Sequence, residues 1–211
     1  MDLSIQDLKA QINVYNFFAV FFRAKPSREW LKSALEFMAS WDETDSPEER
    51  LLHQQLLDRL QQDGLESYSE FLRREYERLF FAPGRVLVNL YESVYRGSGL
   101  LMQETTIAVR KHYLEAGLVT KSLYSIPDDH IATELEFMQF LSQKLLELVQ
   151  KAGPEEDIQK VMVRQSSFLN EHLKQWTPAL AETIKSNSKD PFFQILGIGL
   201  ESLIEVAPTV S

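Results

Sequence analysis

The sequence predicts an all-α protein, a single-domain bundle of about nine or ten helices. Apolar residues recur at spacings of three and four along most of the chain, which is the pattern of one buried helix face. Cap residues and helix breakers divide these stretches from one another. Residues 86–95 alone have a strand-like composition, and no second candidate strand could pair with them.

The first expected helix covers residues 5–22 and is apolar nearly all round. One face carries Ile5, Leu8, Ile12, Tyr15, Ala19 and Phe22, and a second carries Val14, Phe17, Phe18 and Phe21. A helix without a polar face belongs in the interior of a bundle. We therefore expect residues 5–22 to lie at its centre.

Cap signals predict three further helices before residue 82. Ser27 is expected to cap a second helix, which extends to Trp41. Residues 46–49 read Ser-Pro-Glu-Glu, a capping box that opens a third helix ending near Gly64. Residues 67–70 form a second capping box and open the fourth helix.

Helical signals fail between residues 82 and 99, beginning at the breaker pair Pro83-Gly84. The segment that follows is rich in valine, leucine and tyrosine, a composition that argues against disorder. A connection of this length inside a compact domain is often functional. We expect an ordered, partly apolar connection rather than a strand.

Five more helices are expected. The first covers residues 99–116, and the second begins near residue 127. The others begin after Pro154, after a break at residues 176–178, and after Asp190. Gly117 is expected to end the first of these, and residues 118–126 form a second connection. That connection is a candidate hinge between halves 1–117 and 127–211. It would serve either a monomer or a homodimer that exchanges helices.

The stretch from Pro127 to residue 141 contains the strongest candidate site. Pro127 leads into the helix, Asp128 is expected to cap it, and Asp129 would lie in its first turn, where negative charge is favourable. Behind them runs an apolar stripe. The pair Asp129-His130 at the mouth of a long buried helix has two interpretations: a cap beside a solvated imidazole, or a polar site at the edge of a groove.

Composition excludes several classes of protein. The chain has 211 residues and no cysteine, so it has no disulfide and no thiolate metal site. Its net charge of −9 argues against nucleic-acid binding. No apolar run is long enough to span a membrane, and the start of the chain is unlike a secretory signal. These features fit a cytoplasmic protein.

Several common catalytic motifs are absent. The chain has no phosphate-binding loop, no H-E-x-x-H sequence and no Glu-x-x-His pair. His130 and Glu134 are four residues apart and could share a metal, but we favour a helical ion pair. No cofactor or metal is predicted. An alternative function, a small nucleotide-binding protein or enzyme, would depend on Asp129 and His130.

Three separated segments resemble the cytoplasmic chaperones of molybdoenzymes, the TorD/DmsD family. The segments are residues 76–84 with 91–95, residues 127–131 with 134–138, and residues 168–178. The second is similar to the branch that serves trimethylamine-oxide reductase. The usual proline-rich run before the Tyr-x-Ser-Val motif is replaced here by residues 86–90, and a glycine common just after the motif is Gln103.

This resemblance implies an all-α chaperone without catalytic activity. Members bind the twin-arginine signal peptide of a molybdopterin-dependent reductase precursor, aid insertion of its cofactor and delay its export. The resemblance places peptide-binding residues in the connection, at the helix mouth and on an apolar shoulder. These residues are Leu79, Phe80, Pro83, Tyr91, Glu92, Ser93, Tyr95, Asp128, Asp129 and His130. His172 and Trp176 match the third segment, either as site residues or as structural ones.

Overall fold

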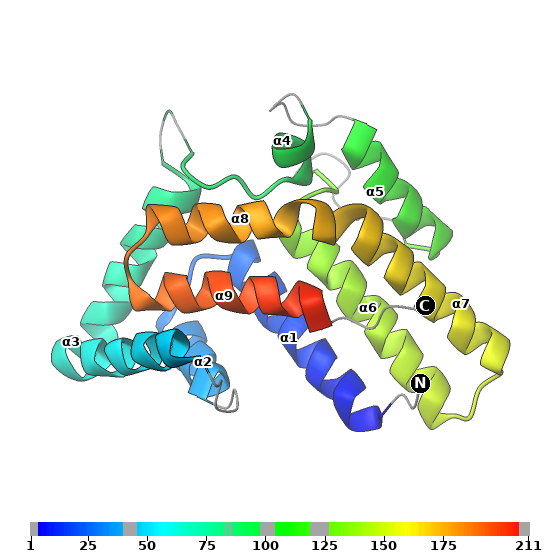
Figure 1. The fold of residues 1–211 in the computed structure, drawn as a ribbon, viewed down its shortest axis with the longest axis horizontal. Helices are drawn as coiled ribbons and strands as arrows, with labels where there is room; N and C mark the ends of the chain where they lie inside the picture. Colours follow the sequence, from blue (N-terminus) through cyan, green and yellow to red (C-terminus); the bar gives the residue numbers. More distant parts are fainter. Residues whose placement is uncertain are drawn as a thin grey trace. The chain divides into compact units, whose positions relative to one another are not determined.

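Figure 1 shows the computed structural model, which describes residues 4–39, 46–82, 84, 86–97, 104–118 and 127–206. Within these residues the regular structure is helical, apart from an isolated β-bridge, and no strand occurs. The predicted all-α class is therefore confirmed. None of the described helices is both long and apolar enough to cross a membrane.

The chain forms two compact units. The first contains Met1–Arg23, Leu90–Pro178 and Ser202–Ser211, and the second contains Ala24–Asn89 and Ala179–Glu201. Each unit thus draws on both of the halves considered from the sequence. Residues 119–126 of the expected hinge lie outside the described residues.

The first unit is built on α1 (Ile5–Arg23), which lies along α6 (Ile131–Gln150). Around this pair lie α4 (Glu92–Arg96), α5 (Glu104–Glu115), α7 (Glu155–Phe168) and the π-helical segment η1 (Leu169–Leu173). The aromatic side chains of α1 that were expected in the core are buried, namely Tyr15, Phe17, Phe18, Phe21 and Phe22. The central place predicted for this helix follows from its two apolar faces.

The predicted break at residues 176–178 is wrong. Helix α8 (Lys174–Asn187) continues directly from η1 and contains Pro178 in its interior. Pro178 has no N–H for the carbonyl one turn earlier, so it normally kinks or ends a helix. Here the Thr177 hydroxyl donates to the Leu173 carbonyl at 2.6 Å, and the wider π turn directly precedes this point. The chain accommodates the proline ring without ending the helix.

The second unit contains α2 (Arg28–Ala39), α3 (Pro47–Phe80), the end of α8 and most of α9 (Pro191–Val206). Ser46 caps α3 as predicted, because its hydroxyl accepts from the Glu49 amide at 3.4 Å. The predicted boundary near Gly64 is a kink inside α3: Gly64 has a non-helical φ of 73° and ψ of 158°, and two helical stretches meet there. Glycine adopts this left-handed conformation without strain, so the chain bends and continues.

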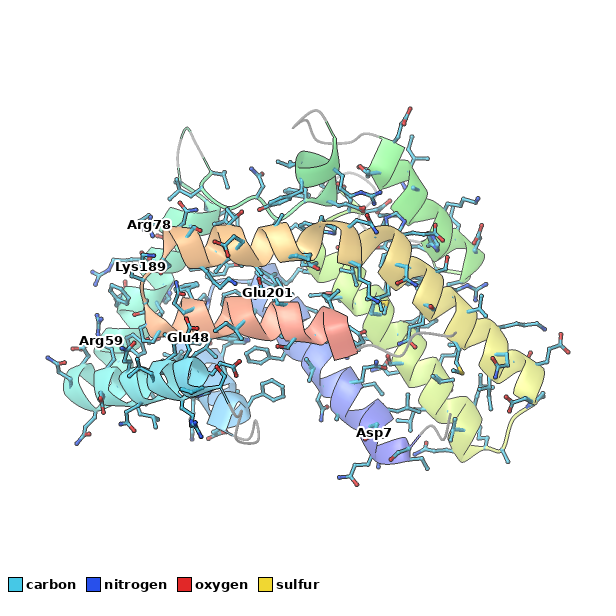
Figure 2. All side chains as sticks on the ribbon, in the orientation of Figure 1. Asp7, Glu48, Arg59, Arg78, Lys189 and Glu201 are labelled. Atoms are coloured by element: carbon cyan, nitrogen blue, oxygen red, sulfur yellow. The ribbon has the colours of Figure 1, made fainter. Side chains whose placement is uncertain are left out.

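Polar contacts fix the end of α3 against the turn between α8 and α9. Arg78, labelled in Figure 2, pairs with Glu75 at 2.7 Å and donates to the Asn187 carbonyl at 2.5 Å. Asp190 caps α9 as predicted: its Oδ1 accepts from the Phe192 amide at 3.0 Å. The same oxygen accepts from the Tyr68 hydroxyl at 2.8 Å, so a single carboxylate joins α3 to α9.

Candidate functional site

An isolated antiparallel β-bridge between Tyr91 and His130 joins the two predicted site segments. The Glu92 amide donates to the Asp129 carbonyl at 3.0 Å, and the Ile131 amide donates to the Leu90 carbonyl at 2.9 Å. The Tyr91 and His130 rings meet edge to face, with centroids 5.0 Å apart. Residues about forty positions apart in the chain are thereby fixed side by side.

The expected ordered connection contains the short helix α4, which was not predicted. Its first residue has no side-chain cap of its own. Asp129 supplies one from across the bridge, because its Oδ2 accepts from the Ser93 amide at 2.9 Å. Its Oδ1 accepts from the Thr106 hydroxyl of α5 at 3.0 Å. A carboxylate at the amino end of a helix satisfies free amides and favours the helix dipole.

Helix α6 begins later than predicted, and Asp128 does not cap it. The bridge holds His130 in an extended conformation, and its Nδ1 accepts from the Ala132 amide at 3.1 Å. His130 is therefore the cap. Asp128 instead pairs with Arg110 of α5, and its carbonyl accepts from the Tyr113 hydroxyl at 3.0 Å. Asp128 and Asp129 thus attach α4 and α5 to the mouth of α6.

The helix mouth is buried, which corrects the interpretation of the Asp129-His130 pair as a cap beside a solvated imidazole. Asp129 has no exposed surface and His130 is 7% exposed, so the imidazole is not solvated and Asp129 does not form an open rim. Burial, and to a smaller extent the positive charge of Arg23, lower the pKa of His130 to about 4. His130 is therefore neutral at physiological pH and serves as a hydrogen-bond acceptor.

A second buried layer lies behind the bridge and contains two carboxyl groups. Glu92 pairs with Arg96 in its own helix and lies 2.9 Å from Nδ1 of His172. Burial, the charge of Glu92 and that of Asp129 raise the pKa of Glu134 well above its usual value. The Trp176 indole donates to Oε2 of Glu134 at 3.1 Å. The Glu134 carboxyl group therefore holds its proton more readily than an exposed carboxyl group does.

The structure gathers part of the predicted site. Tyr91, Glu92, Ser93 and residues 128–130 lie together in the first unit, and Tyr95 packs against Trp176 with ring centroids 5.4 Å apart. Leu79 and Phe80 belong to the core of the second unit, where both are buried. Pro83 lies outside the described residues. Tyr91 and Tyr95 are half-buried, so they present surface that the carboxylates lack.

Several residues of this cluster were not predicted as site residues. Thr106, Arg110 and Tyr113 come from α5, and no local motif connects them to the helix mouth. Glu134 was noted only for an ion pair or metal shared with His130; among the described residues no such pair occurs, because Glu134 bonds Trp176 instead. His112, Glu171 and His172 form a separate group of potential metal ligands.

Two hollows flank that group of ligands. One, of ≈ 520 Å³, lies between α4, α5 and η1 and is bordered by Arg96, Thr105 and Gln175. The other, of ≈ 510 Å³, lies between α5 and α7. Among the described residues, none of those predicted to bind a peptide lines either hollow.

Residues 42–182 match the model of the family described as the nitrate reductase delta subunit. The chain belongs to this family. The match spans the bridge, the helix mouth and the π segment, and it confirms at family level the resemblance seen in the sequence.

The chain is similar to several curated proteins. One of them is chaperone protein TorD from Photobacterium profundum, which is 33% identical over 107 residues. That alignment covers 49% of this chain and 46% of the relative. Chaperone protein TorD from Vibrio parahaemolyticus is 28% identical over 123 residues, covering 58% and 55%. The chain thus spans about half the length of the curated relatives it matches.

A solved structure shares the fold. It is the crystal structure of a protein from Archaeoglobus fulgidus that is described as a redox enzyme maturation protein. The TM-score is 0.56 at 18% identity, and the alignment covers 92% of this chain and 93% of the other. At this identity the likeness concerns the fold alone.

Proposed function

We propose that this protein is a chaperone for the maturation of a molybdopterin-dependent oxidoreductase, and not an enzyme. It binds the twin-arginine signal peptide of the precursor in the cytoplasm, aids insertion of the cofactor and delays export. The observation that carries the proposal is the β-bridge between Tyr91 and His130, because it unites the two segments that resemble such chaperones. Relatives named chaperone protein TorD support the same role.

The peptide would contact the half-buried tyrosines above a buried layer of negative charge. Tyr91 and Tyr95 offer aromatic surface, and Glu92, Asp128 and Asp129 lie beneath it. Arg96 and Arg110 already pair with two of these carboxylates. These two arginines neutralise only part of the negative charge, so the guanidinium groups of a signal peptide would approach a region that is still negative. The buried carboxylates would fix the register of the peptide in two ways. Their electrostatic potential would attract the guanidinium groups, and their hydrogen bonds would hold the backbone around the tyrosines in place.

Apolar burial would supply most of the affinity. Burying on the order of 500 Å² of the apolar part of a signal peptide yields roughly 12 kcal/mol at ~25 cal/mol per Å². Ordering the peptide costs about 2–5 kcal/mol, and loss of translational freedom costs more. An exposed arginine–carboxylate pair contributes about 0–1 kcal/mol. The tyrosines are thus the expected anchors.

The alternative function, a small nucleotide-binding protein or enzyme using Asp129 and His130, has less support. Both carboxylate oxygens of Asp129 accept hydrogen bonds from the chain itself. Nδ1 of His130 is also occupied, and its pKa of about 4 is far from that of a general base active near neutral pH. These groups hold the structure together rather than facing a substrate.

Calorimetric titration with a synthetic twin-arginine signal peptide tests the proposal. Tyr91→Ala and Tyr95→Ala should each weaken binding by about five- to thirty-fold, because aromatic anchors carry disproportionate binding energy. Leu114→Ala is the matched control, since Leu114 is a large apolar residue, 56% exposed, on α5 of the same unit. Wild-type affinity in both tyrosine variants would remove the site assignment. No binding of the peptide, with binding of a nucleotide instead, would favour the alternative.

The oligomeric state is a separate part of the proposal. A monomer and a homodimer that exchanges helices across residues 118–126 both remain compatible with peptide binding. Light scattering coupled to size-exclusion chromatography, with and without the peptide, distinguishes them. A mass of one chain in both conditions would reject helix exchange.

A further inference from the structure

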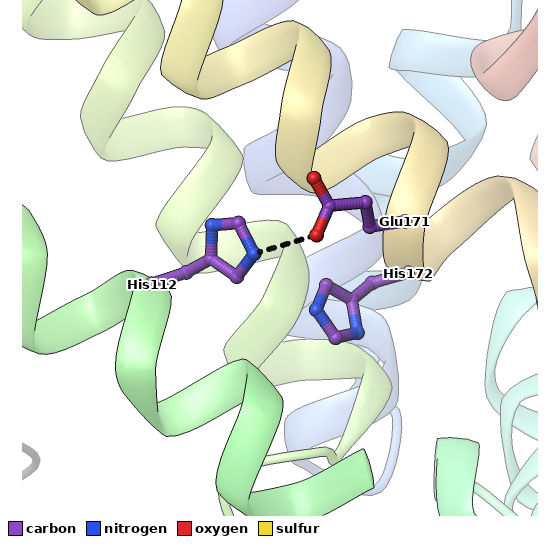
Figure 3. A group of neighbouring side chains, drawn as sticks. All are labelled: His112, Glu171 and His172. Atoms are coloured by element: carbon purple, nitrogen blue, oxygen red, sulfur yellow. Dashed lines mark ion pairs between the residues drawn. The ribbon is translucent and has the colours of Figure 1, made fainter.

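Three potential metal ligands meet where α5 faces the π segment η1. His112 comes from α5, and Glu171 and His172 are consecutive residues of η1 (Figure 3). One ligand atom from each lies within 4.8 Å of the others. Nε2 of His112 and Oε2 of Glu171 are 3.4 Å apart, as the dashed line in Figure 3 marks. Three donors from two elements therefore lie in one group, and one pair of them is only 3.4 Å apart.

We propose that His112, Glu171 and His172 form a binding site for a divalent transition-metal ion of the Zn²⁺ type. Tetrahedral Zn²⁺ with bonds of about 2.0–2.1 Å has ligand atoms about 3.3–3.5 Å apart. The separation of 3.4 Å between His112 and Glu171 matches this spacing, whereas it is long for a direct hydrogen bond. Two imidazoles and a carboxylate suit zinc and its neighbours rather than Mg²⁺ or Ca²⁺.

The orientation of His172 supports the site independently of these distances. Its Nδ1 lies 2.9 Å from the carboxylate of Glu92, so Nε2 is the nitrogen left for a metal. A histidine ligand that donates its other N–H to a carboxylate is the usual arrangement in metal sites, and it fixes the ring and its tautomer. Glu92 is held in turn by Arg96. The buried carboxylate and its arginine thus form a support behind the ligand.

The backbone and the ring packing also hold the ligands in place. Arg96 donates to the Glu171 carbonyl at 2.6 Å, which ties η1 to α4. The Phe168 ring packs against both imidazoles, with centroids 5.4 Å from His112 and 4.9 Å from His172. The two imidazoles are nearly perpendicular, with centroids 5.1 Å apart. Glu171 and His172 lie in a π segment, and such segments recur at functional sites in proteins.

Three protein ligands leave a fourth position for water or for a side chain of a partner. Glu171 and His172 border the hollow of ≈ 520 Å³ between α4, α5 and η1, so this position is accessible. Thr105 borders the same hollow, and its hydroxyl oxygen is buried with no hydrogen-bond partner among the described residues. A water molecule on the metal would satisfy such a group. The site therefore has the open coordination of an exchangeable or interaction site rather than of a closed structural one.

Zn²⁺ binding to the full chain, after metal is removed with a chelator, tests this proposal. Calorimetry should give a single Zn²⁺ per chain, and Co²⁺ should produce the visible absorption of a four-coordinate ion. His112→Ala and Glu171→Gln should each weaken Zn²⁺ binding by about tenfold or more. Neither residue is fully buried, so both variants should keep the helical circular dichroism of the wild type.

Matched controls separate this site from binding by any surface histidine or carboxylate. His53→Ala removes a histidine of the second unit, and Glu147→Gln removes a carboxylate that is 68% exposed. Both should bind Zn²⁺ as the wild type does. Unchanged affinity in the His112 and Glu171 variants would overturn the proposal, as would equal binding of Mg²⁺ or no Zn²⁺ binding. Signal-peptide binding is measured separately, so either proposal can fail alone.

Discussion

The side chains of Glu92 and His172 meet in the interior of the first unit, where Oε2 and Nδ1 are 2.9 Å apart although 80 residues separate them in the chain. Glu92 has no exposed surface, and the His172 side chain is 3% exposed. Arg96 completes the group by pairing with the same carboxylate. This relationship joins α4 to η1 and so holds the bridge segment against the third segment of the family pattern.

Removal of the Glu92 carboxylate should therefore destabilise the fold. Glu92→Ala leaves a buried imidazole and a partly buried guanidinium without their common partner, which typically costs about 3–5 kcal/mol. Glu136→Ala is the control, because Glu136 is 49% exposed in its pair with Arg23 and should cost less than about 1 kcal/mol. Urea unfolding measures both. Equal losses in the two variants would contradict a structural role for the Glu92–His172 contact.

The carboxylate of Asp190 should contribute more to the stability of the fold than an exposed helix cap does. Asp190→Ala removes the cap of α9 and leaves the buried Tyr68 hydroxyl without its acceptor, at a combined cost of about 2–4 kcal/mol. Asp190→Asn keeps an acceptor oxygen and should cost less. Asp58→Ala, on the exposed face of α3, should be nearly neutral. If Asp190→Ala unfolds at the same urea concentration as Asp58→Ala, the link from α3 to α9 is unimportant.

The sequence predicts the helices well because local physics determines them. The caps at Ser46 and Asp190 and the terminator Gly117 are where the residue types place them, and Gly117 has the expected positive φ of 78°. Errors occur where contacts that residue types do not reveal change a local preference. Pro178 is typical of a helix end, yet it lies inside α8, shortly after the π turn.

The candidate site is less predictable from sequence for the same reason. Asp128 has the sequence context of a cap, but the β-bridge holds residues 128–130 extended and transfers the cap to His130. Asp129 caps another helix, α4, whose five residues carry no helical signal of their own. Resemblance to a family could pair these segments, whereas spacing along the chain could not.

Truncation of the α1 core should distinguish its buried face from its exposed one. Phe18→Ala removes a fully buried ring and should cost roughly 3–5 kcal/mol. Val20→Ala, two residues away on the same helix, is the control, since Val20 is 41% exposed and should cost well under about 1 kcal/mol. Denaturant unfolding gives both values. A loss below about 1 kcal/mol for Phe18→Ala would place this face of α1 outside the core.

The buried imidazole of His130 should make the protein sensitive to mild acid. Its folded pKa of about 4 lies below the value of 6.5 for an exposed histidine, so the folded state binds the proton less well than the unfolded state. The resulting stability is fully present above pH 6.5 and is lost as the pH falls towards 4. Between pH 7.5 and 5 the loss should be about 2 kcal/mol.

Comparison with His130→Asn isolates this contribution, because groups common to both proteins cancel. Asparagine does not titrate in this range, and its side-chain oxygen can accept from the Ala132 amide as Nδ1 of His130 does. The free energy of unfolding in urea should therefore fall less for His130→Asn than for the wild type between pH 7.5 and 5. His53→Asn, which removes a histidine of the second unit, is the control and should follow the wild type. If the free energy of unfolding has the same pH dependence in the wild type and His130→Asn, the imidazole is protonated at pH 5 in the folded protein as well as in the unfolded one. The helix mouth would then be open to water.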